Sequence, residues 1–291
     1  MADRSGLPTP RRHPFEVHEV ALVALGSATT LALLAASQVL IAVLLETVGA
    51  TILYATVIFA CRSRTARFTI RLLASYGFVI WFYCAVARIT PALETKLRDG
   101  ALLAIDEAIF GQTPAIFWEG AARAWLTDLM SLCYLTYHFY LAVAVLHAAL
   151  VLNIASQRFR VYLFTGFAIG FAGYLLVPAV GPAGAYPELF RDPLPGGTSA
   201  QLIAKVVAAG SSVYDVFPSL HVLITCILLD HDWRQLRRRF WIMAGPSLGL
   251  MISTVYLRYH YGVDVLAGFL LFLALRQTFL KAWRSEARIP E

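Results

Sequence analysis

Long runs of apolar residues, separated by short polar segments, recur along nearly the whole chain. A helix needs about 20 apolar residues to cross a hydrocarbon core of about 30 Å. The runs that meet this requirement lie at 20–37, 39–60, 70–89, 129–152, 160–179, 217–231, 240–257 and 262–280. We therefore predict an all-α fold, a polytopic transmembrane helical bundle of about six to eight spans.

The pattern is ambiguous in the first two spans and short in the sixth. Residues 20–60 contain one formal charge, Glu46. One long tilted helix with a short re-entrant piece is therefore an alternative to two helices there. The segment 217–231 is barely long enough to cross a bilayer, which suits a helix whose outer end lies recessed in a cavity.

Composition and charge agree with a membrane protein. Apolar residues make up 59% of the 291 positions and charged residues 14%, which is more apolar than a soluble domain. If the N-terminus lies inside, the inner segments hold sixteen Lys and Arg residues and the outer segments seven. Both termini are thus predicted to be cytoplasmic. The net charge of +6 is spread over short membrane-flanking loops, so nucleic acid is not an expected partner.

Two long segments lie between the predicted spans on the outer side. The segment 90–128 mixes apolar and charged residues and includes Trp118 and Trp125, which predicts helices lying in the membrane interface. The segment 180–216 is rich in Pro and Gly. Such residues predict an irregular, ordered loop, and we expect it to roof a site.

Two histidines and one carboxylate are the candidate catalytic groups. His221 lies near the outer end of the sixth span, and His260 and Asp264 lie at the outer start of the eighth, so all three share one side of the membrane. Asp264 is four residues after His260, and on a helix both would lie on one face. A carboxylate that orients an imidazole leaves its second nitrogen free to attack phosphorus. We predict that His260 attacks and that His221 protonates the leaving oxygen.

Phosphate oxygens need donors and positive charge. Pro218 and Ser219 precede His221 as a helix start would, so Ser219 is expected to contact phosphate. The candidate basic residues on the outer side are Arg258, Arg191 and Lys205. On a continuous helix Arg258 would point away from His260, so it can help only if the backbone there is irregular. The alternative for the two loop residues is that they are simply solvated.

These segments resemble motifs of a known family. The run Phe-Pro-Ser-Leu-His at 217–221 is similar to the second motif of the type-2 phosphatidic acid phosphatase superfamily, and 259–264 with Gly268 is similar to its third. The likeness is closer to the aureobasidin-resistance branch, which contains inositol phosphorylceramide synthases. There a stretch of the form Asp-x-x-x-Phe-Gly-x-x-Pro, as at 106–114, precedes the core.

The resemblance covers roughly residues 100–280. It implies a helical membrane fold, a phosphohistidine at His260, His221 as proton donor, Asp264 as the orienting carboxylate, and no metal or other cofactor. The chain departs from the family pattern in two places. The first motif is absent in its usual form, with Gly181 and Pro182 in the equivalent stretch, and the arginine that opens the third motif in phosphatases is replaced by Thr254.

We accordingly divide the chain into a cytoplasmic N-terminal tail (1–19), N-terminal transmembrane helices (20–90), a phosphatidic acid phosphatase-like catalytic membrane domain (91–280) and a cytoplasmic C-terminal tail (281–291). The expected enzyme takes a phosphoryl or phospho-headgroup from a lipid phosphoester at the outer face of a plasma or inner membrane. The lipid would be a phospholipid, a polyprenyl phosphate or a sphingolipid. Transfer to an alcohol, hydrolysis, and a non-catalytic role on the same fold remain as alternatives at this stage.

Overall fold

The computed structural model describes residues 15–37, 40–61, 68–151, 153–210 and 212–286. In those ranges every regular element is helical. The long helices are α1 (Val17–Ala35), α2 (Ile41–Ala60), α3 (Phe68–Ala92), α6 (Ala124–Leu150), α7 (Ile154–Leu176), α10 (Leu220–Gln235), α11 (Arg237–Tyr256) and α12 (Gly262–Glu286). The short ones are α4 (Asp99–Phe110), α5 (Pro114–Phe117), α8 (Pro182–Ala185) and α9 (Thr198–Gly210).

Each of the eight predicted spans coincides with one long helix, which confirms the all-α membrane fold. Six helices of the described part, α1, α2, α3, α6, α7 and α12, are long and apolar enough to cross a membrane. The other two, α10 and α11, do not meet both criteria. α10 has only 16 residues, as the short sixth run implied, and α11 begins with three consecutive arginines.

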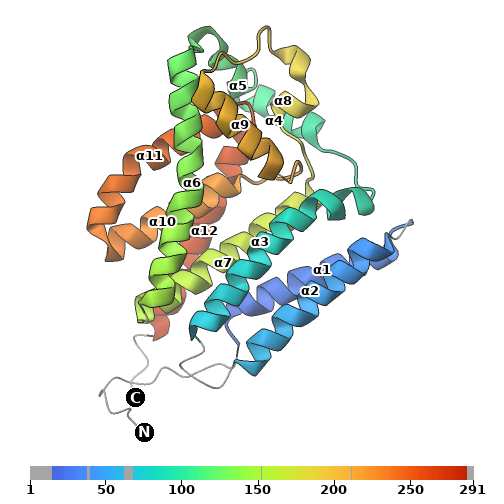
Figure 1. Ribbon diagram of the computed structural model, residues 1–291, viewed down its shortest axis with the longest axis vertical. Helices are drawn as coiled ribbons and strands as arrows, with labels where there is room; N and C mark the ends of the chain where they lie inside the picture. The colour runs from blue at the N-terminus through green and yellow to red at the C-terminus, as the bar shows by residue number, and fades with distance from the viewer. Residues whose placement is uncertain (1–14, 38–39, 62–67, 152, 211, 287–291) are drawn as a thin grey trace.

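The N-terminal segment forms two helices, so the alternative of one long helix is wrong. α1 and α2 pack against each other and run side by side at one edge of the molecule (Figure 1). α1 begins at Val17, earlier than the predicted start at residue 20. Glu16 and Glu19 form a capping box there. These two charged residues were assigned to the N-terminal tail from the sequence, but they belong to the start of the helix.

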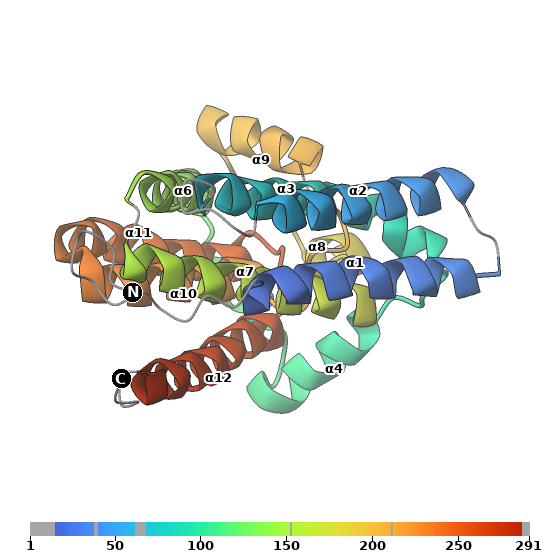
Figure 2. The ribbon, with the colours of Figure 1, turned by 90° about the horizontal axis from the view of Figure 1, so that it is seen from below.

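The long helices form two layers, and α10 lies in the interior of the bundle. Figure 2 shows α6, α3 and α2 in one layer and α11, α10, α7 and α1 in the other, with α12 and α4 beyond the second layer. α10 contacts α6, α7, α11 and α12. It is apolar nearly all round, and Leu223, Ile224 and Ile227 are fully buried. A helix of that composition is stable only in an interior position, which places its first residues inside the bundle.

Glycines allow the start of α10 to pack closely between α7 and α12. A Cβ added to Gly170 would lie 2.2 Å from Leu220, and one added to Gly173 would lie 2.2 Å from Pro218. From the other side, a Cβ on Gly268 would lie 2.5 Å from the carbonyl oxygen of Ser219. No side chain fits in such gaps, so these positions fix where α10 begins.

The outer segment 180–216 was expected to be an irregular loop, and this is only partly correct. Residues 186–197 are irregular apart from a short 3-10 turn, but residues 198–210 form helix α9. α9 packs on α6 through Ala200 and Ile203, which are buried. Apolar residues recur at helical spacing within 198–210, which is typical of a helix. The prediction of a loop was based on the Pro and Gly residues that precede this segment.

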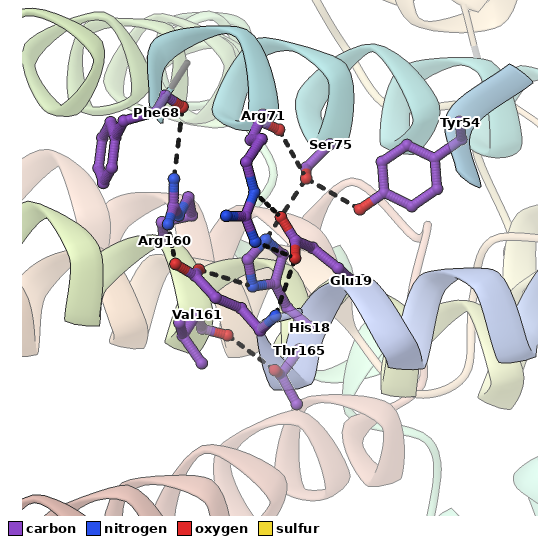
Figure 3. A network of polar contacts seen from close by, with 10 residues as sticks. His18, Glu19, Tyr54, Phe68, Arg71, Ser75, Arg160, Val161 and Thr165 are labelled. Carbon is purple, nitrogen blue, oxygen red and sulfur yellow. Dashed lines mark hydrogen bonds and ion pairs between the residues drawn. The ribbon is translucent and has the colours of Figure 1, made fainter. Parts of the chain in front are cut away.

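Buried charges join the first turns of α1 and α3 to the second turn of α7 (Figure 3). Arg71 donates from Nε and Nη2 to the two carboxylate oxygens of Glu19. Arg160, which is 2% exposed, pairs with Glu16 and donates to the carbonyl oxygen of Phe68. Removal of one partner would leave an unpaired buried charge, so these pairs fix the helix ends relative to one another.

The same cluster brings three potential metal ligands together. The ligand atoms of Glu16, His18 and Glu19 lie within 4.8 Å of one another. Both carboxylates are already paired, Glu19 with Arg71 and Glu16 with Arg160. The two guanidinium groups that pair with these carboxylates would repel a metal cation bound between them. We therefore interpret the cluster as charge-balanced ion pairs that stabilise the bundle.

Candidate active site

The two histidines singled out in the sequence meet in the interior of the bundle. His260 Nε2 lies 3.4 Å from His221 Nδ1. His221 is in the first turn of α10 and 8% exposed, and His260, in the turn between α11 and α12, is 2% exposed. The prediction that both motifs share one side of the molecule is confirmed.

Asp264 faces the other nitrogen of His260, but for a different reason than predicted. Its Oδ2 lies 3.5 Å from His260 Nδ1. His260 is not on the helix, because α12 begins at Gly262. The pair meets because the turn folds back. The amide of Tyr261 donates to Asp264 Oδ2 at 2.7 Å, and the amide of His260 donates to the carbonyl of Thr254 at 3.0 Å.

Two buried aspartates from α4 hold this turn in place. Asp106 accepts hydrogen bonds from the amides of Gly262 at 2.9 Å and Val263 at 2.8 Å, so it caps α12. Asp99 accepts the Tyr261 hydroxyl at 3.0 Å and the amides of the 180–181 segment. Burial raises the pKa of the Tyr261 hydroxyl, and Asp99 raises it further. This hydroxyl therefore stays a proton donor.

Ser219 and the start of α10 lie beside the carboxylate. Ser219 is the N-cap residue of α10 and is fully buried. Its amide donates to the carbonyl of Asp264 at 3.1 Å, which joins the two motifs directly. The predicted helix start is correct, although Pro218 precedes the cap residue and does not lie in the first turn.

Several polar atoms of the site have no hydrogen-bond partner in the described structure. They are Ser219 Oγ, Asp264 Oδ1 and His260 Nδ1, whose contact with Asp264 is longer than a hydrogen bond. Buried polar atoms nearly always have partners. Of the three, the Ser219 hydroxyl is the one that can donate to an oxygen of a bound anion, because Asp264 Oδ1 is an acceptor and His260 Nδ1 faces Asp264.

Two tyrosines of α6 complete the surroundings of His221 and were missed in the sequence. The rings of Tyr134 and Tyr137 lie with their centroids 4.7 Å and 4.8 Å from that of His221. Tyr134 also contacts Tyr259, at 5.2 Å. The two tyrosines are three residues apart, so they share a helix face. That spacing was visible in the sequence, but nothing in it indicated that the face turns toward His221.

The three predicted basic ligands lie in different elements: Arg258 in the turn between α11 and α12, Arg191 in the irregular segment before α9, and Lys205 on α9. The backbone at Arg258 is irregular, with φ +65°, which is the condition for a role near His260. Its guanidinium nevertheless donates to the carbonyl of Asp192 at 2.9 Å, lies 3.5 Å from Glu119 and stacks on the Phe190 ring. The other two candidates, Arg191 and Lys205, are exposed. None of the three is shown to bind phosphate by this geometry.

Comparison with known proteins agrees with the membrane fold. The family described as the PAP2 superfamily matches residues 100–276. A PA-phosphatase related-family protein of Dictyostelium discoideum is 23% identical over 163 residues, which are 48% of this chain and 30% of the relative. The match thus spans less than a third of that relative's length. No solved structure matches.

The chain belongs to the PAP2 superfamily, because the match extends over more than half of its length. The matched region begins in α4 and ends in α12, so it contains the histidine pair, Asp264 and Asp106. Membership supports an enzyme of the lipid phosphatase or phosphotransferase type. The narrower likeness to the inositol phosphorylceramide synthase branch is not confirmed by these matches.

Proposed function

We propose that the protein transfers a phosphoryl or phospho-headgroup from a lipid phosphoester to an alcohol through a phosphohistidine at His260, as an inositol phosphorylceramide synthase-type phosphotransferase would. The observation that carries this proposal is the line of three groups at the site. Asp264 faces Nδ1 of His260 at 3.5 Å, and His221 faces Nε2 at 3.4 Å. The imidazole therefore has an orienting carboxylate on one side and a proton donor on the other.

Before the first step, Asp264 holds His260 in the tautomer that keeps its proton on Nδ1, so the lone pair of the neutral ring lies on Nε2. Nε2 attacks phosphorus, the bond from phosphorus to the lipid oxygen breaks, and His221 gives that oxygen its proton. We expect Ser219 Oγ, which has no partner in the described structure, and the first amides of α10 to donate to the phosphate oxygens. In the second step, His221 takes the proton of the acceptor hydroxyl, whose oxygen displaces His260.

The molecule that accepts the phosphoryl group, an alcohol or water, decides between two functions. Both functions would use the same residues of the site. The burial of His260 and Asp264, 2% and 0% exposed, favours an alcohol over bulk water. Hydrolysis is the second candidate, and the name of the Dictyostelium relative favours it. In either case the expected substrate is a membrane lipid at the outer leaflet, either a phospholipid, a polyprenyl phosphate or a sphingolipid.

The test is a product analysis with purified protein in detergent and EDTA. The donors are phosphatidate, polyprenyl pyrophosphate and phosphatidylinositol, the last with and without ceramide or diacylglycerol. A new headgroup-bearing lipid that forms only with an alcohol acceptor and disappears in His260→Ala supports the transferase. Free phosphate that disappears in the same variant supports the phosphatase. Because histidine carries the phosphoryl group, EDTA should not lower either rate.

Two results would contradict the proposal. Activity that EDTA abolishes and a divalent cation restores would show that the chemistry needs a metal. Lipid turnover that is unchanged in His260→Ala would show that this residue is not the nucleophile and would favour a non-catalytic role for the site.

A further inference from the structure

The imidazole of His221 lies against two aromatic rings from one helix. The ring centroids of Tyr134 and Tyr137 on α6 are 4.7 Å and 4.8 Å from that of His221, and the ring planes are tilted by 38° and 53°. The two tyrosines are three residues apart, so both rings reach His221 from one face of α6. They are 6% and 8% exposed, so the surrounding packing holds both rings in place.

The surroundings of His221 oppose the positive charge that a proton donor must carry. The residue is 8% exposed, so a charged imidazole loses most of its hydration there. It also lies in the first turn of α10, where the helix dipole repels a cation. In the described part of the chain, the titratable groups whose charge acts on His221 are His260 and His138. A positive charge on either would repel a second one.

The carboxylate of the site does not remove this difficulty. Asp264 faces Nδ1 of His260 at 3.5 Å, whereas His221 faces Nε2 of the same ring. The negative charge of Asp264 is thus separated from His221 by the His260 imidazole. The protonated form of His221 therefore needs stabilisation from another source.

The faces of the two tyrosine rings can supply it. An aromatic ring attracts a cation within about 6 Å of its centroid, and more strongly where water is excluded. Both tyrosine rings lie within this distance of the His221 ring. The Tyr134 ring also lies 5.2 Å from the ring of Tyr259, the residue before His260. Tyr134 therefore contacts the proposed proton donor and the neighbour of the proposed nucleophile.

We propose that Tyr134 and Tyr137 are positioning residues, whose rings stabilise the protonated form of His221 and hold it toward His260. This inference rests on the proposed function, in which His221 carries a proton when the lipid oxygen leaves. That proton passes from the imidazolium to the oxygen, and the neutral His221 then takes the proton of the acceptor. The rings act in both steps, and the tyrosine hydroxyls take no part in this role.

The experiment measures the protonation of His221 directly, so its result does not depend on lipid turnover. Nitrogen-15 NMR follows histidine-labelled protein in detergent through a pH titration, and His221→Asn identifies the signals of His221. Tyr134 and Tyr137 are replaced singly by phenylalanine, which keeps the ring, and by leucine, which removes it. A third replacement, trifluorophenylalanine, keeps the shape but withdraws electrons from the ring face.

Tyr140→Leu is the matched control for the loss of a buried aromatic ring from α6. Tyr140 is 3% exposed, and its hydroxyl donates to Asp232, which Arg239 also binds. This variant should leave the titration of His221 unchanged. Thermal unfolding checks that each variant is folded, and the trifluorophenylalanine replacements provide the test if a leucine variant unfolds.

We expect the phenylalanine variants to titrate like the parent. Leucine or trifluorophenylalanine at either position should lower the titration midpoint of His221 by about 0.5 to 1 pH unit, as loss of one cation–π contact in a water-excluded site implies. The high-pH limb of the turnover profile should move to lower pH by the same amount, because turnover needs protonated His221.

Loosened packing would shift the titration in the opposite direction. A leucine variant that admits water would hydrate the imidazolium and raise the midpoint. An unchanged or raised midpoint with trifluorophenylalanine, or an equal fall with phenylalanine, would overturn the proposal. Failure of the proposed function is a separate result. A midpoint that falls as expected, in a protein whose turnover persists in His260→Ala, would support the effect of the rings and contradict the phosphohistidine.

Discussion

The two ring nitrogens of His260 face different groups, and this asymmetry determines what the residue can do. Asp264 lies on the Nδ1 side and His221 on the Nε2 side. A neutral imidazole has one protonated and one free nitrogen. A carboxylate on the Nδ1 side favours the tautomer with its proton on Nδ1, so the lone pair lies on Nε2, which faces the site. The same carboxylate also accepts the amide of Tyr261, so the orienting group is itself fixed.

Asp264→Asn tests the orienting role. An asparagine keeps the shape and can still accept the Tyr261 amide, but it can donate to Nδ1 and so favour the wrong tautomer of His260. We expect the turnover rate to fall by about 10³-fold or more, as in other sites that rely on a carboxylate to orient histidine. The melting temperature should change little. A rate within about tenfold of the parent would contradict the assignment.

The three candidate site residues were predictable from the sequence, but part of their setting was not. Two histidines and one aspartate at fixed places in two motifs were enough to name His221, His260 and Asp264. The partners of Arg258 were not predictable, because Glu119, Phe190 and the Asp192 carbonyl come from distant outer segments. Nor was the contact of Tyr134 with His221, because helix rotation within a bundle depends on packing that no local pattern encodes.

At the scale of elements, the site depends on how α4 holds the start of α12. Asp106 is fully buried. Its carboxylate accepts hydrogen bonds from the amides of Gly262 and Val263 and from the hydroxyl of Thr113. The first amides of a helix have no partner within it. In this fold a side chain from another helix supplies that partner, which ties the interfacial segment to the catalytic turn.

Asp106→Ala should therefore lower stability and activity together. Loss of the carboxylate leaves buried amides unsatisfied, at a cost of about 1–3 kcal/mol. Glu107→Ala is the control, since it removes a carboxylate from an exposed neighbour on the same helix. Thermal unfolding and lipid turnover are measured for both variants. If the two variants behave alike, Asp106 does not position the turn.

The close approach of α12 to α10 gives a second test at this scale. In Gly268→Ala the new Cβ would lie 2.5 Å from the Ser219 carbonyl, so the helices must separate and Ser219 must move away from Asp264. We expect a lower melting temperature and a loss of activity of at least about tenfold, from a displacement of the order of 1 Å.

Gly77→Ala is the matched control for this test, because nothing lies within 4 Å of a Cβ at that position in α3. It should leave activity unchanged and raise helix stability by about 0.5–1 kcal/mol. Full activity in Gly268→Ala would show that the contact between the two motifs is not required.

Helix positions were more predictable than helix boundaries and connections. All eight long apolar runs became helices, because hydrophobic length is encoded locally. α9 was missed, and the catalytic turn at 257–261 was expected to be helical enough to align His260 with Asp264. That turn instead depends on hydrogen bonds to Thr254 and Asp106. Such bonds exist only once distant segments have packed together.

At the scale of the whole molecule, two polar sites occupy opposite ends of one bundle. One is the histidine pair, and the other is a polar groove of about 530 Å³ where α7 begins and where α10 and α12 end. α7 runs between them, from this groove to the glycines that hold the start of α10. The charge pattern predicts that the groove end is cytoplasmic and the histidine end is outside.

Cysteine labelling of intact cells tests this orientation. Arg191→Cys lies in the irregular segment before α9 and Arg238→Cys in the first turn of α11, and both positions are exposed. A membrane-impermeant maleimide should label Arg191→Cys directly and Arg238→Cys only after permeabilisation. The parent chain controls for its native cysteines. Direct labelling of Arg238→Cys alone would reverse the predicted topology.

The measurement that tests the central claim most directly is detection of the covalent intermediate. Protein is mixed with a lipid donor labelled in its phosphorus, quenched within one turnover in alkali and digested, and the labelled peptide is sequenced by mass spectrometry. The account predicts phosphorus on His260, absent in His260→Ala. Label on any other residue, or steady turnover in the wild type with no labelled protein at any time point, would contradict it.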